Sequence, residues 1–480
     1  MKYNILTGII LLFVIVLKIS LMDVTFFWDA ITCLSLPARF FYENKLQTFV
    51  YSGWLDNGDP HVIPYLLAIV WTLFGKNLII SHLMFLPVVA GAVFQIILLC
   101  KKTLAPNCGK SDFIVFFFGC LLVLADPSIL TQLLLLGIDL WVIFFAIYAV
   151  NQMLCDKKAG LSLAFIGLCL TNKRGMIIAA TLMIVYVLKI FLLERRAFSV
   201  KEFTKIILPT LPGCFTVFIY LLFRFYYHGW VFTNVDSAWA GTGNLVDFYG
   251  FIRNCAAFVW RNLDFGRIGL WAVMLFMLVK FGYKRLFNSE TCFLWLSYFL
   301  LQFSFACVTL TITNPFGARY FVVQFILFAI LTVKLVFDLF DEKHAKIIAS
   351  LLIVISVTGN LWLYPEKIAK NWDCTLKHLP FYSLRKECFD YMEKHEIAYE
   401  QTASGFCLYG DQRNVDLMNK ERIIQSILTE ETRFFLYSNI SNLEDELIDE
   451  LNNSEIWTNI KTFESGGIFI RVLSKNKEQK

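Results

Sequence analysis

Long apolar runs, separated by short polar ones, fill the first three quarters of the chain. Most of them approach the roughly twenty residues that an α-helix needs to cross a bilayer. The run at 160–171 is too short to span alone and must borrow residues from its flanks. The pattern predicts an all-α polytopic membrane protein with about eleven spans. These lie near residues 5–22, 77–99, 113–136, 139–154, 160–171, 175–193, 205–226, 266–281, 291–312, 320–340 and 345–364.

The pattern changes from Asn371 onward. Residues 384–394 and 444–451 space their apolar positions as amphipathic helices do. Residues 433–437 and 467–473 alternate as strands do. We therefore expect two domains: a polytopic transmembrane domain at 1–364 and a small soluble α/β domain at 365–480.

Composition supports the membrane class. The chain is 58% hydrophobic and 17% charged, with a mean hydropathy of +0.61, whereas ordinary soluble domains carry more charge. The first apolar run contains Lys18 and lacks a small-residue cleavage site, so we expect a retained anchor instead of a signal peptide. The net charge of +5 comes from loop residues and indicates no nucleic-acid partner. The sequence lacks Walker and Rossmann motifs, which argues against ATP-driven transport.

Basic residues are distributed among the loops in a way that predicts the topology. Lysines and arginines gather in every second loop, at 101–102, 157–158, 195–201, 284–285 and 343–346. Cytoplasmic loops carry this excess in multi-pass proteins. We therefore expect a multi-pass plasma (inner) membrane protein with a cytoplasmic N-terminus and an extracytoplasmic C-terminal domain. The remaining loops should share the outer side, at 23–76, around 139, at 172–174, 227–265 and 314–319.

Acidic side chains follow the first span on that outer side. Asp29 comes directly after it, and Asp56, Asp59 and His61 follow in a stretch that returns to apolar sequence at 62–74. Ionisable groups beside lipid are unfavourable unless they are paired or used. Asp29 is therefore a candidate catalytic residue, with the alternative that it caps a short interfacial helix. Asp59 and His61 are the candidates for a divalent metal ion, which the ligand count alone does not establish.

Two basic sites on the outer side break the charge rule. Lys173 and Arg174 form a very short turn between two spans, and Arg319 precedes another span. Each alone is explained equally well by snorkelling, in which the aliphatic stem lies in apolar surroundings and the charge reaches the headgroups. Together they suit a phosphate, because arginine offers a bidentate fork and lysine a point charge.

Asp139 has two alternative positions. If the chain turns at Gly137, Asp139 caps the following helix at the outer surface, on the same side as Asp29. If the chain breaks at Pro127 instead, Asp139 lies within the membrane and requires a partner. In both cases a functional role is favoured over a purely structural one.

These residues resemble those of the GT-C membrane glycosyltransferases, in the branch that contains the protein O-mannosyltransferases and the lipid A aminoarabinose transferase. The early motifs are Asp29 after the first span, Asp56-Asn57-Gly58-x-Pro60-x-x-x-Pro64 ending at Leu73-Phe74-Gly75, and Asp126-Pro127 followed by Ile138-Asp139. The later motifs are Thr171-Asn172-Lys173-Arg174-Gly175 and Arg319-Tyr320-Phe321. The resemblance covers roughly residues 1–340.

The resemblance implies a GT-C-like fold with an outward C-terminal domain, and a polyprenyl-phosphate sugar as the donor on the extracytoplasmic side. The chain departs from the family pattern at three positions. Ala30 stands where many members have Glu, His61 replaces a second Pro, and Leu134 replaces an Arg. These departures leave Asp29 in place but weaken the case for a metal site and for any one substrate class.

The expected chemistry is an inverting transfer of a sugar to an extracytoplasmic glycolipid, glycan or protein. Asp29 would accept the proton of the attacking group as general base. Lys173, Arg174 and Arg319 would stabilise the departing phosphate. Asp56, Asp59, His61 and Asp139 would bind or orient the substrates.

Two other functions are compatible with the same residues: a transporter or flippase for lipid-linked glycans, and a non-catalytic assembly subunit. Transporters often contain an internal repeat, which this sequence does not show. The candidate charges also gather on one side of the membrane instead of lining both halves. Both observations favour the glycosyltransferase.

Overall fold

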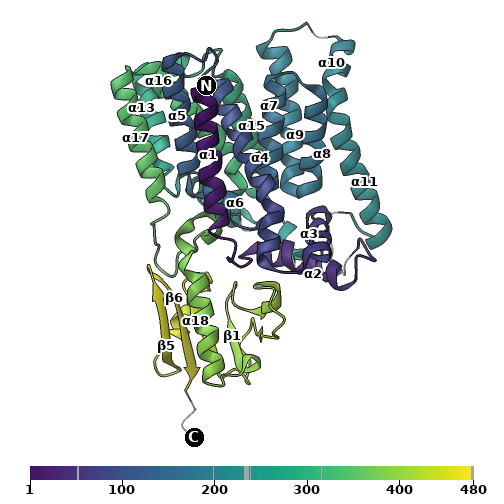
Figure 1. Cartoon of the computed structure of the whole chain (residues 1–480), viewed down its shortest axis with the longest axis vertical. Coiled ribbons are helices and arrows are strands. Elements are labelled where there is room, and N and C mark those ends of the chain that lie inside the picture. Colours follow the sequence, from purple (N-terminus) through teal and green to yellow (C-terminus); the bar gives the residue numbers. More distant parts are fainter. Residues whose placement is uncertain (51–52, 198, 232–236, 238, 315, 477–480) are drawn as a thin grey trace.

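The computed structural model describes residues 1–50, 53–197, 199–231, 237, 239–314 and 316–476 of the 480-residue chain. Long helices form one body, and a small domain with a β-sheet lies beyond one end of it (Figure 1). The chain begins at the opposite end of the helical body, far from this domain (Figure 1).

All the apolar runs that we predicted to span contain helices. Among the described residues, six helices are long and apolar enough to cross a membrane, or up to eight if each of two bent pairs is one span. Three further runs form the shorter helices α7, α8 and α17, of 16, 14 and 17 residues. The fold is therefore that of a polytopic helical membrane protein. Its helices are α1 (Lys2–Ile19), α4 (Leu78–Leu104), α5 (Lys110–Ala125), α6 (Pro127–Leu134), α7 (Asp139–Leu154), α8 (Lys158–Thr171), α9 (Lys173–Leu188), α10 (Val200–Ile207), α11 (Leu211–His228), α12 (Phe248–Leu263), α13 (Ile268–Phe281), α15 (Cys292–Thr309), α16 (Val322–Leu339) and α17 (Glu342–Thr358).

The predicted span at 113–136 is bent instead of straight. Its two helices, α5 and α6, meet at Asp126 with a bend of 72°. Pro127 has no backbone N–H with which to continue α5. The Asp126 carboxylate instead accepts hydrogen bonds from the N–H groups of Ser128 and Ile129 at 2.8 and 3.2 Å, which starts α6.

The stretch at 227–265, which we expected to be a loop, contains the helix α12. This helix meets α13 at a bend of 89°. Gly266 at the bend has a φ of 86°, and a Cβ there would lie 2.4 Å from the Ile355 carbonyl oxygen. The next residue, Arg267, is buried and places its Nη1 2.9 Å from Oδ2 of Asp126. A buried ion pair therefore joins the two bends.

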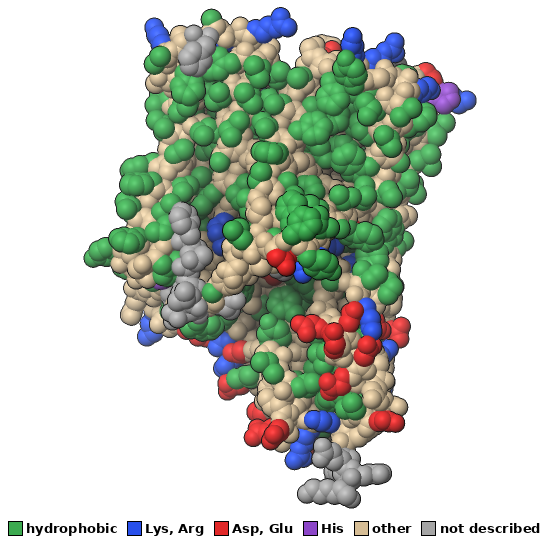
Figure 2. Space-filling view, turned by 180° about the vertical axis from the view of Figure 1, so that it is seen from behind, with side chains coloured by type: hydrophobic (Ala, Val, Ile, Leu, Met, Phe, Trp, Pro, Cys, Tyr) green, Lys and Arg blue, Asp and Glu red, His purple; other side chains and the backbone are tan. Residues whose placement is uncertain are grey.

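The helical body has an apolar surface and a dense interior. Figure 2 shows hydrophobic side chains over most of its flank, with lysines and arginines at the end far from the C-terminal domain and acidic side chains on that domain. In α16, every side chain from Val322 to Val336 is buried. A helix that is buried all round lies inside its bundle, so α16 is central to the body.

The C-terminal domain contains a four-stranded sheet in the order β1-β4-β6-β5, with α18 (Pro380–Lys394) packed against β6 and β5. β1 (Thr402–Ser404) is parallel to β4 (Phe434–Ser438). β6 (Ile468–Lys475) is antiparallel to both β4 and β5 (Trp457–Ser465). A separate pair is formed by β2 (Gly410–Asp411) and β3 (Ile423–Ile424). Together with α19 (Asp445–Leu451), this arrangement confirms the predicted α/β domain and its four predicted elements.

The first loop packs against the C-terminal domain. After α1 it forms the π-helical turn η1 (Ile31–Ser35), then α2 (Leu36–Glu43), η2 (Gly53–Leu55) and α3 (Val62–Phe74). The Phe27 ring is stacked on His378 of the domain, with ring centroids 4.3 Å apart. The backbone N–H of Phe26 donates to the Val415 carbonyl at 3.0 Å. These contacts bring Asp29 next to residues from the far end of the sequence.

Candidate active site

Asp29 lines a small cavity at the junction of the helical body and the C-terminal domain. The cavity has about 40 Å³ of free space. The ionisable side chains that line it are four carboxylates, two guanidiniums and the Cys33 thiol. They come from widely separated parts of the chain: Asp29, Asp59, Asp139, Arg174, Arg319 and Asp373.

Arg319 is at the centre of this group. It lies in η6 (Ala318–Phe321), directly before α16, and its side chain is only 10% exposed. Its guanidinium forms an ion pair with Asp29. Its Nη1 lies 2.7 Å from Oδ2 of Asp373, and its Nε lies 3.6 Å from Oδ2 of Asp139. One arginine thus holds carboxylates from the first loop, from α7 and from the C-terminal domain.

Arg174 forms the second cation of the cavity. It belongs to the first turn of α9, where the Asn172 side chain accepts a hydrogen bond from the Gly175 N–H at 2.8 Å. Its Nη2 lies 2.9 Å from Oδ1 of Asp139. Its guanidinium also lies 4.2 Å from the centre of the Tyr320 ring. The helix cap at Asn172, the ion pair with Asp139 and the contact with the Tyr320 ring together fix the orientation of Arg174.

The sequence left two positions open for Asp139, according to whether the chain turns at Gly137 or breaks at Pro127. The expected cap is not formed, because Ile138 is the N-cap residue of α7 and no side chain among the described residues bonds to the free N–H groups there. The chain is interrupted at both places, because α6 begins at Pro127 and α7 begins at Asp139 itself. Asp139 lies in the cavity with Asp29 and contacts both arginines. The turn after α6 therefore brings Asp139 to the same site as the first loop.

Lys173 contacts the first loop and is not among the residues that line the cavity. Its Nζ donates to the Asn57 carbonyl at 2.7 Å, and its backbone N–H donates to Oδ1 of Asp59 at 2.9 Å. The Asn57 side chain donates to the other oxygen of Asp59 at 3.1 Å. Lys173 thus fixes the 57–59 segment against the start of α9. Of the three cations predicted to hold a phosphate, Arg174 and Arg319 line the cavity.

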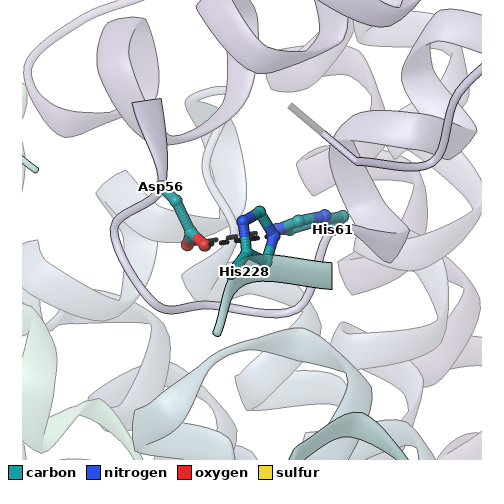
Figure 3. A group of neighbouring side chains, drawn as sticks. All are labelled: Asp56, His61 and His228. Atoms are coloured by element: carbon teal, nitrogen blue, oxygen red, sulfur yellow. Dashed lines mark ion pairs between the residues drawn. The ribbon is translucent and has the colours of Figure 1, made fainter. Parts of the chain in front are cut away.

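Asp56, His61 and His228 form a second group (Figure 3), whose ligand atoms all lie within 4.8 Å of one another. His61 Nε2 lies 4.0 Å from Oδ1 of Asp56, and His228 Nε2 lies 3.7 Å from its Oδ2. The buried Arg224 places Nη2 3.4 Å from the same carboxylate. Burial alone would raise the pKa of Asp56, but His61 and Arg224 hold it below its usual range.

This second group fits a divalent transition metal by donor type and spacing. One carboxylate and two imidazoles are common zinc ligands. The Nδ1 of His61 lies 3.1 Å from the Phe49 carbonyl, which orients Nε2 toward Asp56. Arg224 competes with a metal ion for the same carboxylate. Of the two metal candidates from the sequence, His61 belongs to this group, whereas Asp59 is held by Lys173 and lines the other cavity.

Sequence reasoning missed Asp373, Arg224 and His228. Asp373 lies in η7 (Trp372–Cys374), where the pattern showed only the beginning of a soluble domain. Burial raises its pKa above the usual range, although Arg319 opposes this effect. Arg224 could have been found, because it lies inside the predicted span at 205–226 and a charge there requires a partner.

Fold and site together define a polytopic helical membrane protein with a charged cavity between its first loop and its C-terminal domain. No protein-family model matches the chain, and the comparison with curated proteins found no match. Among solved structures, the chain is similar to the crystal structure of ArnT from Cupriavidus metallidurans bound to undecaprenyl phosphate. The similarity covers 98% of each chain, with a TM-score of 0.49 and 9% sequence identity. The proposed function therefore rests on the geometry of the site.

Proposed function

We propose that the chain is an inverting glycosyltransferase that moves a sugar from a polyprenyl-phosphate donor to an acceptor outside the membrane. The observation that carries this proposal is the Asp29–Arg319 ion pair in the cavity, with Arg174 beside it. A carboxylate supplies a base for the acceptor, and guanidiniums supply cations for the departing phosphate. The site lies at one end of a bundle of apolar helices, so the polyprenyl chain can remain in lipid.

Asp29 acts as the general base. The acceptor hydroxyl attacks the anomeric carbon, the bond between that carbon and the phosphate oxygen breaks, and Asp29 takes the hydroxyl proton. A single displacement of this kind inverts the configuration at the anomeric carbon. General-base catalysis typically contributes about 10²–10⁴-fold to the rate.

Arg319 and Arg174 stabilise the leaving group. A sugar-linked polyprenyl phosphate is a diester with one negative charge, and its departure produces a monoester with a charge approaching two. Cations placed at the phosphate therefore bind the transition state more strongly than the donor, as catalysis requires. Guanidiniums suit this task through paired hydrogen bonds.

Donor binding must exchange the partners of Arg319. The free space of about 40 Å³ holds about one or two water molecules, so a sugar ring enters only when the ion pairs open. The donor phosphate replaces the Asp29 carboxylate on Arg319. That exchange releases Asp29 at the moment when a base is needed.

We further propose that the end of the molecule with the C-terminal domain faces the extracytoplasmic side of the inner membrane. The basic loops at the opposite end support this orientation. In this arrangement 1–364 is the transferase domain in the membrane, and 365–480 is a soluble domain that closes the site.

Asp56, His61 and His228 would hold a divalent metal ion, which would supply a Lewis acid. The 57–59 segment links this group to the cavity, because Asp59 lines the cavity wall. Lys173 fixes that segment to α9 independently of any metal. The steps assigned to Asp29, Arg174 and Arg319 do not require the ion.

The test is an Asp29→Asn variant, which keeps the size of the side chain and removes the base. We expect transfer to fall at least ~10²-fold with normal expression and membrane insertion. Asp390→Asn, which changes an exposed carboxylate on α18, serves as the matched control and should transfer normally. Normal glycan levels in Asp29→Asn would exclude Asp29 as the base.

A second measurement separates the transferase from a transporter. In detergent, purified protein supplied with a panel of polyprenyl-phosphate sugars should release free polyprenyl phosphate as product forms. A flippase has no two sides to connect in detergent and yields no chemical product. Lipid translocation in vesicles together with no sugar transfer by any donor would favour the transporter.

A further inference from the structure

A second, larger cavity shares one wall with the first. It contains about 560 Å³ of free space. Asp29, Ala30 and Cys33 line the small cavity, whereas Ile31 and Thr32, which lie between them, line the large one. The Thr32 hydroxyl donates to the Asp29 carbonyl at 3.3 Å. The two cavities are therefore separated by a single helical turn, residues 29–33.

Aromatic side chains from the first loop and from the C-terminal domain face this larger cavity. Trp54 of η2 is 58% exposed, and Tyr409 of the domain is 37% exposed. Phe406 also lines the cavity, with its ring centroid 5.9 Å from that of Tyr409. The Phe406 ring packs edge-on against Trp28, with centroids 4.9 Å apart. Aromatic rings provide rigid apolar surface at little entropic cost. The C–H faces of a pyranose ring are suited to stack on such a surface.

The charged side chains that line this cavity are Arg39, Glu43 and Asp411, and the arginine is paired with both carboxylates. Arg39 Nη1 lies 2.7 Å from Oδ2 of Asp411 and 3.1 Å from Oδ1 of Asn414, and its Nε lies 2.5 Å from Glu43. Arg413 also pairs with Asp411, at 2.8 Å. Arg413 lies behind this wall and pairs with Glu421 as well, at 3.2 Å. Both guanidiniums are thus already paired with carboxylates, and the lining itself holds one cation against two anions, so this wall does not favour an anionic ligand. Its carboxylate and amide oxygens can still accept hydrogen bonds from hydroxyl groups.

We propose that this cavity binds a neutral sugar ring of the acceptor. The ring lies between Trp54 and Tyr409, and its hydroxyls bond to the polar wall around Arg39 and Asp411. The acceptor is then a glycan or the saccharide of a glycolipid, and its attacking hydroxyl is one helical turn from Asp29. The C-terminal domain selects the acceptor, since it supplies one wall of the cavity. This inference rests on the proposed transferase function and narrows its acceptor class.

Binding of free sugars to the purified full chain tests the cavity without catalysis. Saturation-transfer NMR in detergent would use maltose and N,N′-diacetylchitobiose as neutral probes and glucose 6-phosphate as a charged probe. We expect the neutral sugars to bind, and Trp54→Ala and Tyr409→Ala to weaken binding about five- to tenfold, the scale of one aromatic contact. Trp54→Phe should keep most of the binding. Phe248→Ala removes an aromatic side chain of α12 that is 80% exposed and should change nothing.

Three results would overturn the inference: no binding of either neutral sugar, equal binding by wild type and the alanine variants, or tighter binding of the phosphorylated sugar. Transfer assays then separate this inference from the proposed function. If Trp54→Ala raises the acceptor KM and leaves the donor KM unchanged, both stand. If transfer depends on Asp29 but ignores Trp54 and Tyr409, the function stands and the cavity assignment fails. If sugars bind through Trp54 but wild type transfers nothing, the cavity remains a saccharide site and the proposed function fails.

Discussion

Arg319 pairs with carboxylates from the first loop, from α7 and from the C-terminal domain. Each of these contacts involves two charged groups that are partly removed from water, which makes them stronger than surface pairs. The same guanidinium is assigned to the donor phosphate. A substitution of Arg319 should therefore change kcat/KM for the donor more than KM for the acceptor.

We expect Arg319→Ala to lower kcat/KM for the donor about 10- to 100-fold, which corresponds to the loss of about 1.5–3 kcal/mol of charge-assisted hydrogen bonding. Arg319→Lys should recover part of this loss, because it restores the charge without the planar fork. Steady-state kinetics with varied donor and varied acceptor measure the effect. Arg253→Ala, at an exposed position on α12, is the control. An effect confined to the acceptor KM would contradict the role of Arg319.

Single residues of the site could be predicted where a charged side chain lies beside an apolar, membrane-spanning segment. Asp29, Asp139, Arg174 and Arg319 were all assigned to one side, and the structure places them in one cavity. Asp373 was not predictable, because a carboxylate at the beginning of a soluble domain is ordinary in sequence. Its proximity to Arg319 arises only from how the domain packs on the helical body.

At the scale of elements, His378 connects the C-terminal domain to the first loop. It ends η8 (Leu376–His378), is fully buried and stacks on Phe27. Its Nδ1 lies 2.6 Å from the Thr375 carbonyl, and its Nε2 lies 2.9 Å from the Tyr382 hydroxyl. Burial lowers the pKa of His378 to about 4 from its ordinary value of 6.5. The imidazole is therefore neutral in the folded protein.

This pKa predicts that the protein loses stability on acidification. Between pH 6.5 and 4 the unfolded chain binds a proton that folded His378 does not, so stability is highest above pH 6.5 and falls through this window. The loss approaches about 3 kcal/mol. Thermal unfolding in detergent at pH 7.5 and 5.0 measures it. His378→Phe should reduce the dependence, whereas the exposed His395→Gln should preserve it. An equal dependence in His378→Phe and wild type would contradict this assignment.

The two bent helix pairs provide a second prediction at this scale. Asp126 and Arg267 join the two bends, and Arg267 also lies 3.8 Å from the centre of the Phe325 ring. Removing one partner of a buried pair leaves an uncompensated charge and typically costs about 3–5 kcal/mol. We expect Arg267→Ala to lower the unfolding temperature strongly. Lys367→Ala, which breaks a surface pair with Asp449, should cost less than about 1 kcal/mol. Equal melting temperatures in the two variants would argue against a structural role for the buried pair.

Hydropathy predicted where helices occur better than how they bend. The length of the apolar runs identified the helical segments, because a helix needs about twenty residues to cross a bilayer. The length of a run does not indicate a bend, which depends on local groups. The Asp126-Pro127 dipeptide signalled the first bend, whereas the second depends on a glycine that lies against the Ile355 backbone. We did not predict the helix α12 (Phe248–Leu263), because the order of spans placed residues 227–265 in an outer loop.

At the scale of the whole molecule, the positions of the two ends test the topology. The N-terminus and the C-terminal domain lie at opposite ends of the helical body (Figure 1). With a cytoplasmic N-terminus, a reporter that is active only in the cytoplasm should be silent when it is fused after Lys480. The same reporter fused within the basic loop at 195–201 should be active. A bright signal from the Lys480 fusion would reverse the orientation and place the active site in the cytoplasm.

The contact between Asp29 and Arg319 spans 290 residues of sequence. A ribosome that adds roughly 5–20 residues per second needs roughly 15–60 s to make that stretch. During this interval the first loop with Asp29 is complete, but neither Arg319 nor Asp373 yet exists. Chains that are truncated before residue 373 can insert their helices and still lack a finished cavity. If the proposed function holds, partial synthesis products are inactive, and activity begins only when the C-terminal domain docks on the first loop.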